Sequence, residues 1–252
     1  MKTITVTAAI LMLAIGSISS CKKKSTPVEP TPDPVVVTNV ITPQTTVHAV
    51  VNLSSLSTLA ILAGSGITNT GATIITGDMG LSPGTSIGGF PPGILNGTLH
   101  VNDAIATQAK LDLTAAYNDA AGRTSTDIVT LSGNIGGLTL TPGLYKSTST
   151  LALTSGDLTF DAQGKPGAIF IIQVASALTV TSDRKVFLSG GALASNIFWQ
   201  VGSSATFGTT SAFKGTIMVL ESISFSTGAT LEGRALARNG AVTMQGNTIV
   251  KN

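Results

Sequence analysis

The chain has 252 residues, of which 10% are charged, 42% hydrophobic and 4% aromatic. Soluble domains usually carry about 25% charged residues. This charge-poor, apolar composition excludes disorder driven by charge repulsion. The formal net charge of +2 is too small to indicate a nucleic-acid-binding surface.

The N-terminus is typical of a bacterial export signal that ends in a lipidation site. Lys2 precedes an apolar stretch, Ile4–Ile18, which is shorter than the about 20 residues that cross a membrane. Cys21, the only cysteine, follows Ser19–Ser20. This order resembles a lipoprotein box, in which the cysteine becomes the lipidated first residue. We therefore predict a signal peptide over residues 1–20 and a lipid anchor on Cys21, with an ordinary signal and a chance cysteine as the alternative.

Residues 21–51 have the composition of a linker. Lys22–Lys24 is followed by several prolines among Thr and Val, a mixture that favours an extended chain. We expect a tether that holds a domain of residues 52–252 off a membrane. The protein would then be an exported outer-membrane or cell-surface lipoprotein, either anchored or shed.

One helix is predicted over Asn102–Ala121. Asn102 or Asp103 supplies the N-cap oxygen, and Gly122 follows the last turn. Apolar residues recur every three or four positions, which predicts one buried face. These residues are Ile105, Ala109, Leu113, Ala116, Tyr117 and Ala120.

The rest of the predicted domain repeats a Ser/Thr-x-x-Thr-apolar pattern. Further strand-like runs, separated by glycine-rich corners, lie between the copies and give three short strands per repeat. This pattern predicts a mostly-β fold, an irregular triangular β-solenoid (β-helix) whose stacked coils share one core, with the helix packed alongside. The copies begin at Thr70, Ser147, Ser176, Ser203 and Thr227.

One side of this solenoid is predicted to be hydroxylated and uncharged. Side chains alternate along a strand, so the threonine before each inward apolar residue should face outward. The first residue of each copy has the opposite parity and reaches this surface only at a corner or bulge. Thr also favours strands and suits a merely solvated face, which is the alternative. The candidate residues are Thr70, Thr73, Ser147, Thr148, Thr150, Ser176, Thr179, Thr181, Ser203, Ser204, Thr206, Thr227 and Thr230.

Stacked coils would present these side chains as a flat, regular grid. Coils stack about 4.7–4.9 Å apart, and alternate residues lie about 6.6–6.8 Å apart along a strand. Threonine has few χ1 options, so its hydroxyl and methyl stay registered. Such a grid suits a periodic, uncharged partner, and ice is one.

Several segments carry a resemblance to a known family: Leu59–Ala63, Gly64–Ile67, Ile75–Gly84, Phe213–Ile217 and Gly233–Thr243. On these, residues 52–252 resemble the bacterial, fungal and algal ice-binding (antifreeze) proteins, which have a discontinuous right-handed β-solenoid and a long flanking helix. The resemblance implies adsorption to ice, with thermal hysteresis and inhibited recrystallisation, and without catalytic residues or cofactors.

The same resemblance implies two structural features. The N-terminal coil packs beside the C-terminal one, and some members carry a Thr-Ala/Gly-x-Thr/Asn motif on the ice-binding face. Thr70–Thr73 and Thr227–Thr230 match this motif, whereas the other copies begin with serine.

Other functions have less support in the sequence. Solenoid enzymes need clustered carboxylates, whereas Asp78, Asp157, Asp161, Asp183 and Glu232 are scattered. We expect turn or capping roles for Asp157 and Asp161 and a monomer that contacts a membrane only through its anchor.

A metal site and a sugar site are also weakly supported. His48 and His100 are isolated, which gives no metal site, and a structural role is expected for His100. A cell-surface adhesin or carbohydrate-binding solenoid is the alternative function, but sugar sites use exposed aromatic platforms. Trp199 is expected in the core.

Overall fold

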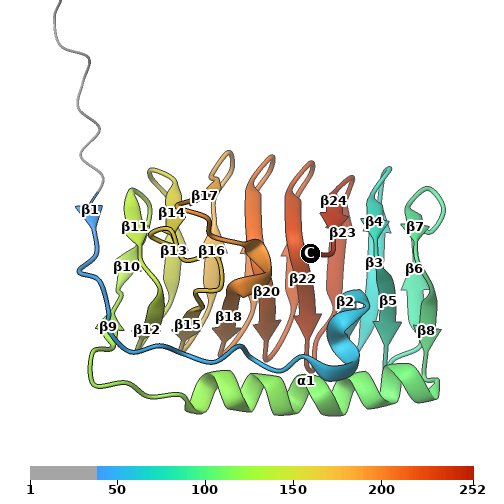
Figure 1. Ribbon diagram of the computed structural model, residues 1–252. Coiled ribbons are helices and arrows are strands. Elements are labelled where there is room, and N and C mark those ends of the chain that lie inside the picture. The colour runs from blue at the N-terminus through green and yellow to red at the C-terminus, as the bar shows by residue number, and fades with distance from the viewer. Residues whose placement is uncertain (1–38) are drawn as a thin grey trace, which may run out of the picture. The chain divides into compact units, whose positions relative to one another are not determined.

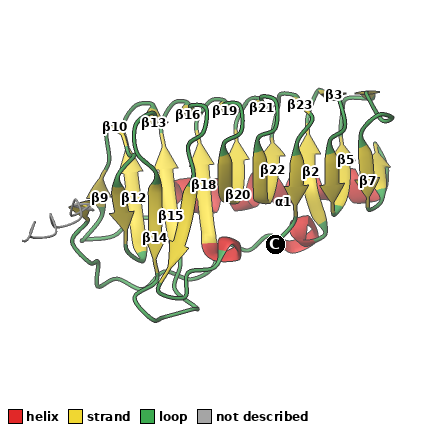
Figure 2. Cartoon of the chain, turned by 90° about the horizontal axis from the view of Figure 1, so that it is seen from above, coloured by secondary structure: helices red, strands yellow, loops and turns green. Residues whose placement is uncertain are grey.

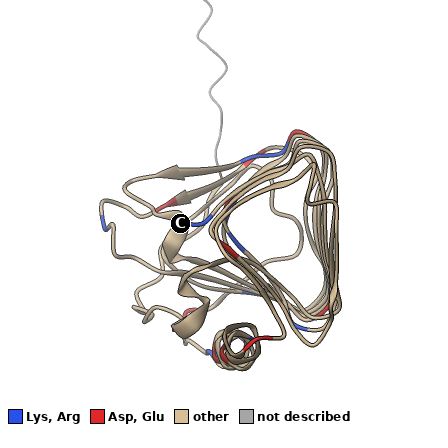
Figure 3. Cartoon of the chain, turned by 90° about the vertical axis from the view of Figure 1, so that its right-hand side faces the viewer, with Lys and Arg blue, Asp and Glu red and all other residues tan. Residues whose placement is uncertain are grey.

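The computed structural model describes residues 39–252 (Figure 1). The predicted signal peptide, the anchor at Cys21 and the first part of the linker lie outside the described residues. The described part belongs to one compact unit, Thr38–Asn252. Short strands pair in parallel, coil on coil, and form the sides of a triangular prism (Figures 2 and 3).

The side that we call the open face is an eight-stranded parallel sheet. It is the straight side at the right of Figure 3, with no charged residue drawn along it between its corners. In spatial order its strands are β10 (Gly133–Asn134), β13 (Leu151–Leu153), β16 (Leu178–Val180), β19 (Ala205–Phe207), β21 (Ile223–Phe225), β23 (Val242–Gln245), β3 (Gly66–Thr70) and β6 (Ser86–Gly88).

The side that we call the helix face lies against the helix α1. It is formed by β9 (Val129–Thr130), β12 (Gly143–Ser147), β15 (Phe170–Val174), β18 (Ile197–Val201), the second halves of β20 (Ala212–Val219) and β22 (Thr230–Ala237), β2 (Leu59–Ala63), β5 (Asp78–Leu81) and β8 (Leu99–Val101).

The remaining side, the mixed face, combines two groups of strands. A four-stranded sheet contains β1 (Asn39–Val40), β11 (Leu138–Leu140), β14 (Leu158–Asp161) and β17 (Val186–Ser189). The second group consists of the first halves of β20 and β22 with β24 (Thr248–Val250), β4 (Ile74–Thr76) and β7 (Ile94–Asn96).

The long strands β20 and β22 turn the corner between the mixed and helix faces. Gly215 and Gly233 sit at this turn with φ angles of +108° and +151°. A Cβ on Gly233 would lie 2.0 Å from the carbonyl oxygen of Gly215, so only glycine fits there.

The order of the coils in the stack differs from their order along the chain. The coil that carries β2, β3 and β4 stacks on the coil that carries β22, β23 and β24, next to the C-terminus (Figure 1). The implied contact between the N-terminal and C-terminal coils is therefore confirmed, as is the expected mostly-β solenoid with one long helix beside it.

The prism interior is an aromatic-rich core. Trp199 is fully buried, as expected, and its ring packs edge-on to Phe160 at 5.8 Å and against Phe213 at 4.9 Å. Phe207 stacks on Phe225 at 4.7 Å. Each fully buried large side chain contributes about 1.5–3 kcal/mol to folding, so a continuous aromatic column stabilises the coils against one another.

Helix α1 spans Ala104–Gly122, and Asp103 caps it by accepting a hydrogen bond from the amide of Ala106 at 2.7 Å. The predicted end at Ala121 is one residue short, because Gly122 is still helical. Ile105 was expected on the buried face but is 48% exposed, and Ala106 takes its place. Within residues 39–252, no helix is long and apolar enough to span a membrane.

The helix packs on outward side chains of the helix face. Leu113 and Tyr117 belong to one buried cluster with Ile171, Phe198 and Met218. Lys110 donates to the carbonyl oxygens of Ala237, at 2.9 Å, and Arg238. Burial, followed by the nearby charge of Arg238, lowers the pKa of Lys110 to about 8. The helix therefore covers this face with apolar contacts and a half-buried amine.

Residues 39–51, which we call the strap, also pack on the solenoid, so the compact unit starts before the predicted boundary at Asn52. Strand β1 pairs with β11. Asp127 accepts hydrogen bonds from the amides of Thr45 at 2.6 Å and Thr46 at 2.9 Å. The hydroxyl of Ser125, then Thr46 and Thr45, hold the pKa of Asp127 well below its ordinary value.

Asp127→Asn should loosen the strap. A depressed carboxyl pKa stabilises the folded state above the group's unfolded pKa of about 3.9 and ceases to do so as pH falls through the folded value. We expect amide hydrogen exchange of residues 44–47 to rise several-fold at neutral pH in this variant, and in the unmodified protein only after strong acidification.

The matched control is Asp78→Asn, which loses a carboxylate that accepts from the amide of Thr98 at 2.8 Å. It should leave exchange of residues 44–47 unchanged. Equal protection in Asp127→Asn and the unmodified protein would contradict the assigned role of Asp127.

Candidate functional site

The open face carries a registered column of small side chains along the middle of its strands. Strand pairing aligns these residues coil by coil, while their neighbours in the strands, such as Leu151, Leu178 and Ile223, are buried. The column consists of Asn134, Ala152, Thr179, Thr206, Ser224, Thr243, Thr68 and Gly88.

This middle column places five hydroxyl-bearing residues on successive coils, from Thr179 to Thr68. At about 4.8 Å per coil they span about 19 Å. Two further columns flank the middle column on the same side of the sheet. The column two residues before it in the chain consists of Thr150, Ala177, Ser204, Ser222, Ala241, Gly66 and Ser86. The column two residues after it consists of Thr154, Thr181, Gly208, Ser226, Gln245 and Thr70. The result is a grid of small groups, with the longer Gln245 at its edge.

None of the eight strands contains a charged residue. The mixed face, in contrast, carries charged residues, and the helix face is covered. On the mixed face Lys214 pairs with Glu232, and at the corner that leads to it Arg184 lies 4.0 Å from Asp157. The helix face is covered by α1 and the strap. Among the described residues, the open face is therefore the broad side that is both uncovered and uncharged.

Several hydroxyls of the grid are held by their neighbours. Thr243 Oγ1 donates to Ser224 Oγ at 3.0 Å, which links two coils of the middle column. Ser204 Oγ accepts from the amide of Ser222, and Ser222 Oγ from the amide of Ala241, each at 3.2 Å. These bonds restrict side-chain rotation and keep the grid rigid.

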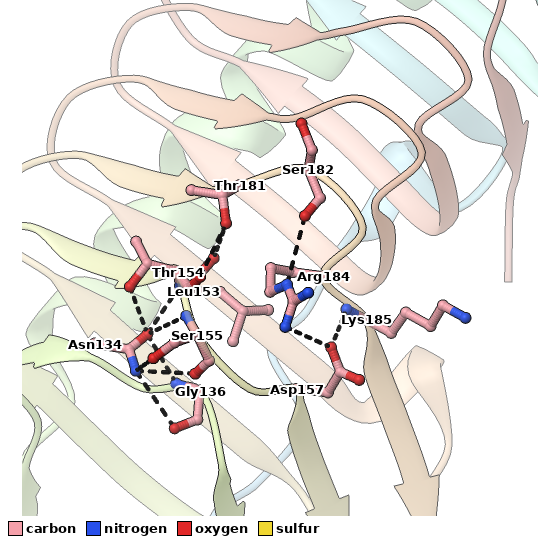
Figure 4. A network of polar contacts seen from close by, with 10 residues as sticks. All are labelled: Asn134, Gly136, Leu153, Thr154, Ser155, Asp157, Thr181, Ser182, Arg184 and Lys185. Atoms are coloured by element: carbon pink, nitrogen blue, oxygen red, sulfur yellow. Dashed lines mark hydrogen bonds and ion pairs between the residues drawn. The ribbon is translucent and has the colours of Figure 1, made fainter.

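One end of the face uses its polar groups internally (Figure 4). Asn134 Oδ1 accepts from the amide and the hydroxyl of Thr154, at 2.8 and 3.0 Å. Thr181 Oγ1 donates to the carbonyl oxygens of Leu153 and Thr154, at 3.1 and 3.3 Å. At this end the hydroxyls satisfy the corner backbone, so fewer of them are free to bind a partner.

The structure brings together part of the predicted residue set. Thr179 and Thr206 lie in the middle column, and the other members on the open face are Thr150, Ser204, Thr181 and Thr70. Four members occupy corners next to it, namely Thr148, Ser176, Ser203 and Thr227.

Three predicted positions are wrong. Thr73 is fully buried and Ser147 is 1% exposed, so neither faces outward. Thr230 is exposed but begins β22 on the mixed face, where it pairs with Ala212 and Thr248.

Unequal corner lengths explain the error at Thr73. Thr70 aligns with Gln245 and Ile74 with Thr248, so the corner of the β3–β4 coil holds one residue more than that of β23–β24. A shift of one residue reverses every side chain. Ile74, which was expected to face inward, is therefore 40% exposed.

The sequence pattern also missed open-face residues. Thr68, Ser224 and Thr243 complete the middle column, but none stands in a Ser/Thr-x-x-Thr-apolar copy at the required place. Their alternation with buried Ile67, Ile223, Phe225 and Val242 was the available signal. Ser86, Ser222 and Ser226 were missed for the same reason.

The scattered polar residues have structural roles. Asp157 accepts from the amide of Lys185 and Asp161 from that of Gln163, each at 2.8 Å, as expected for turns. His100 Nδ1 lies 2.7 Å from the helix-capping Asp103. Burial, followed by Arg123, lowers the pKa of His48 in the strap. Residues 39–252 contain no group of three or more potential metal ligands.

Comparison with known proteins identifies this architecture. The model of the "Ice-binding-like" family matches residues 61–250. An ice-binding protein of Nostoc sp. (strain HG1) is 46% identical over 199 residues, which cover 78% of this chain and 72% of that protein. One of Flavobacterium frigoris (strain PS1) is 40% identical over 212 residues, covering 79% and 75%.

Comparison with solved structures leads to the same family. The crystal structure of an ice binding protein from an Antarctic Biological Consortium shares 74% identity with a TM-score of 0.83, covering 84% of this chain and 96% of that one. A parallel solenoid with a flanking helix thus defines a class whose reported members are named for ice binding and not for catalysis. This chain belongs to the ice-binding-like family.

Proposed function

We propose that this protein adsorbs to ice through its open face, and so causes thermal hysteresis and inhibits recrystallisation. The supporting observation is the neutral middle column, in which Thr179, Thr206, Ser224, Thr243 and Thr68 stack in register. The alternative of an adhesin or carbohydrate-binding solenoid gains no support from the relatives named above.

Adsorption through this face depends on the water that lies over it. Threonine methyls order water above them, while hydroxyls at coil spacing hold it by hydrogen bonds. An exposed charge would bind water tightly in an orientation of its own and interrupt the order. Adsorbed molecules make the ice front bulge between them, and the curvature lowers the local freezing point.

Anchoring, export and oligomeric state extend this proposal. The sequence around Cys21 supports a lipid anchor that places the domain outside the cell, with the chain between Cys21 and the strap as tether. A single open face is sufficient for adsorption, so a monomer suffices. No catalytic step is proposed, because the acidic residues named above make turn, capping or ion-pair contacts.

Residues 39–252, which hold the complete core and strap, should shape ice crystals in a nanolitre cryostat and show a gap between the freezing and melting points. The expected reason is adsorption by the open face alone, without the signal or tether. Unshaped discs that grow freely just below the melting point would exclude the function.

Thr206→Tyr should abolish most of the hysteresis, because a large ring in the middle column prevents close approach to a flat surface. The matched control is Thr230→Tyr, an exposed threonine on the mixed face, which should retain it. Both are surface changes, so unfolding temperatures should differ little. Equal loss in the two variants would show that the open face is not the adsorbing side.

Cys21→Ser should release the protein from the membrane fraction of the producing cell, because one acyl-bearing residue is the expected attachment. Fractionation with immunoblotting measures the result, and Ser20→Ala serves as the neighbouring control that should stay membrane-bound. Unaltered membrane association of Cys21→Ser would exclude lipidation at this position.

A further inference from the structure

A buried polar cluster lies under the corner between the open and mixed faces. Asn69, Thr73 and Asn247 are 6%, 0% and 1% exposed. The sequence predicts Thr73 on the surface, whereas the structure buries it completely. Buried polar groups are costly unless hydrogen-bonded, so their partners show what the cluster does.

Asn247 connects its coil to both neighbours. Its side-chain Nδ2 donates to the carbonyl oxygens of Ser226 at 2.8 Å and Ala229 at 3.0 Å, in the adjoining coil of β21 and β22. Its backbone amide donates to Thr73 Oγ1 at 2.9 Å, in the coil of β3 and β4 on the other side. One residue thus links three coils.

Thr73 and Asn69 continue the chain of hydrogen bonds. Thr73 Oγ1 donates to Asn69 Oδ1 at 2.5 Å. Asn69 Nδ2 donates to the carbonyl oxygens of Gly71 at 2.9 Å and Gly89 at 2.8 Å, the latter in the coil of β6. A continuous buried network therefore runs across the coils that carry β21, β23, β3 and β6.

This network stands at the seam of the molecule. The strands β23 and β3 pair although Asn247 and Thr73 are 174 positions apart in the chain. Neighbouring coils elsewhere follow one another in the chain, but here no short connection sets their spacing. The middle column crosses this seam between Thr243 and Thr68.

Two other positions of this corner column, Ser211 and Ala229, are buried without a side-chain hydrogen bond. Thr230, Thr248 and Ile74 are paired across neighbouring coils. The residues directly before them, Ala229, Asn247 and Thr73, therefore occupy one inward column. Alanine suffices in the coil of β22. Directional hydrogen bonds fix separation and orientation more strictly than apolar contact does, and in this column they lie across the seam.

We propose that Asn69, Thr73 and Asn247 are positioning residues for ice adsorption. They hold the seam coils in register, so that the hydroxyls of Ser224, Thr243 and Thr68 continue one grid across the join. This inference rests on the proposed function of the open face and adds to it a buried determinant that does not touch ice.

Thr73→Val tests the inference, because valine keeps the shape of threonine but removes the oxygen that bonds Asn69 and Asn247. We expect a several-fold loss of thermal hysteresis at temperatures where circular dichroism shows the variant fully folded. Thr73→Ser keeps the oxygen and should restore most of the activity. If Thr73→Val does not fold, Asn247→Ala, which copies Ala229 of the adjoining coil, should show the same loss.

The control is Ile171→Val, a truncation of a fully buried side chain between the helix face and α1. It should lower the unfolding temperature yet keep full hysteresis, which separates positioning from general stability. Full hysteresis in folded Thr73→Val, or a loss in Ile171→Val of equal size, would overturn the inference. Absence of hysteresis in the unmodified protein would instead overturn the proposed function.

Discussion

Parallel, in-register pairing between coils is the constraint on which the rest of the structure depends. It sets the coil spacing at about 4.8 Å and places equivalent residues directly above one another. The same pairing stacks Phe207 on Phe225 inside the prism and aligns Thr206 with Ser224 on its surface. Core packing and surface periodicity are therefore two results of one register.

The three sides of the prism have different roles. The helix and the strap cover one side through apolar contacts. The ion pair Lys214–Glu232 lies on the mixed face, and Arg184–Asp157 lies at the corner between the mixed and open faces. Charge displaced to the corners and the mixed face leaves the open face neutral.

The sequence predicted the fold well because its main signals are local. Alternation, glycine corners and the Asp103 cap each depend on nearby residues, and the solenoid and helix followed from them. Register across coils is not local. Thr179 and Thr206 were correctly placed, whereas Thr73 and Thr230 were not. One extra corner residue turns Thr73 into the interior, and the bent strand β22 places Thr230 on the mixed face. The seam, where distant parts of the chain pair, could be anticipated only from the family resemblance.

Adsorption to ice depends on the open face being both neutral and flat. The most direct test of this dependence is the thermal hysteresis of Ser224→Lys beside that of Thr248→Lys, which place the same charge on the open face and on the mixed face. We expect near-complete loss in Ser224→Lys and unchanged hysteresis in Thr248→Lys, with both proteins folded. Retained hysteresis in Ser224→Lys, or loss confined to Thr248→Lys, would contradict it.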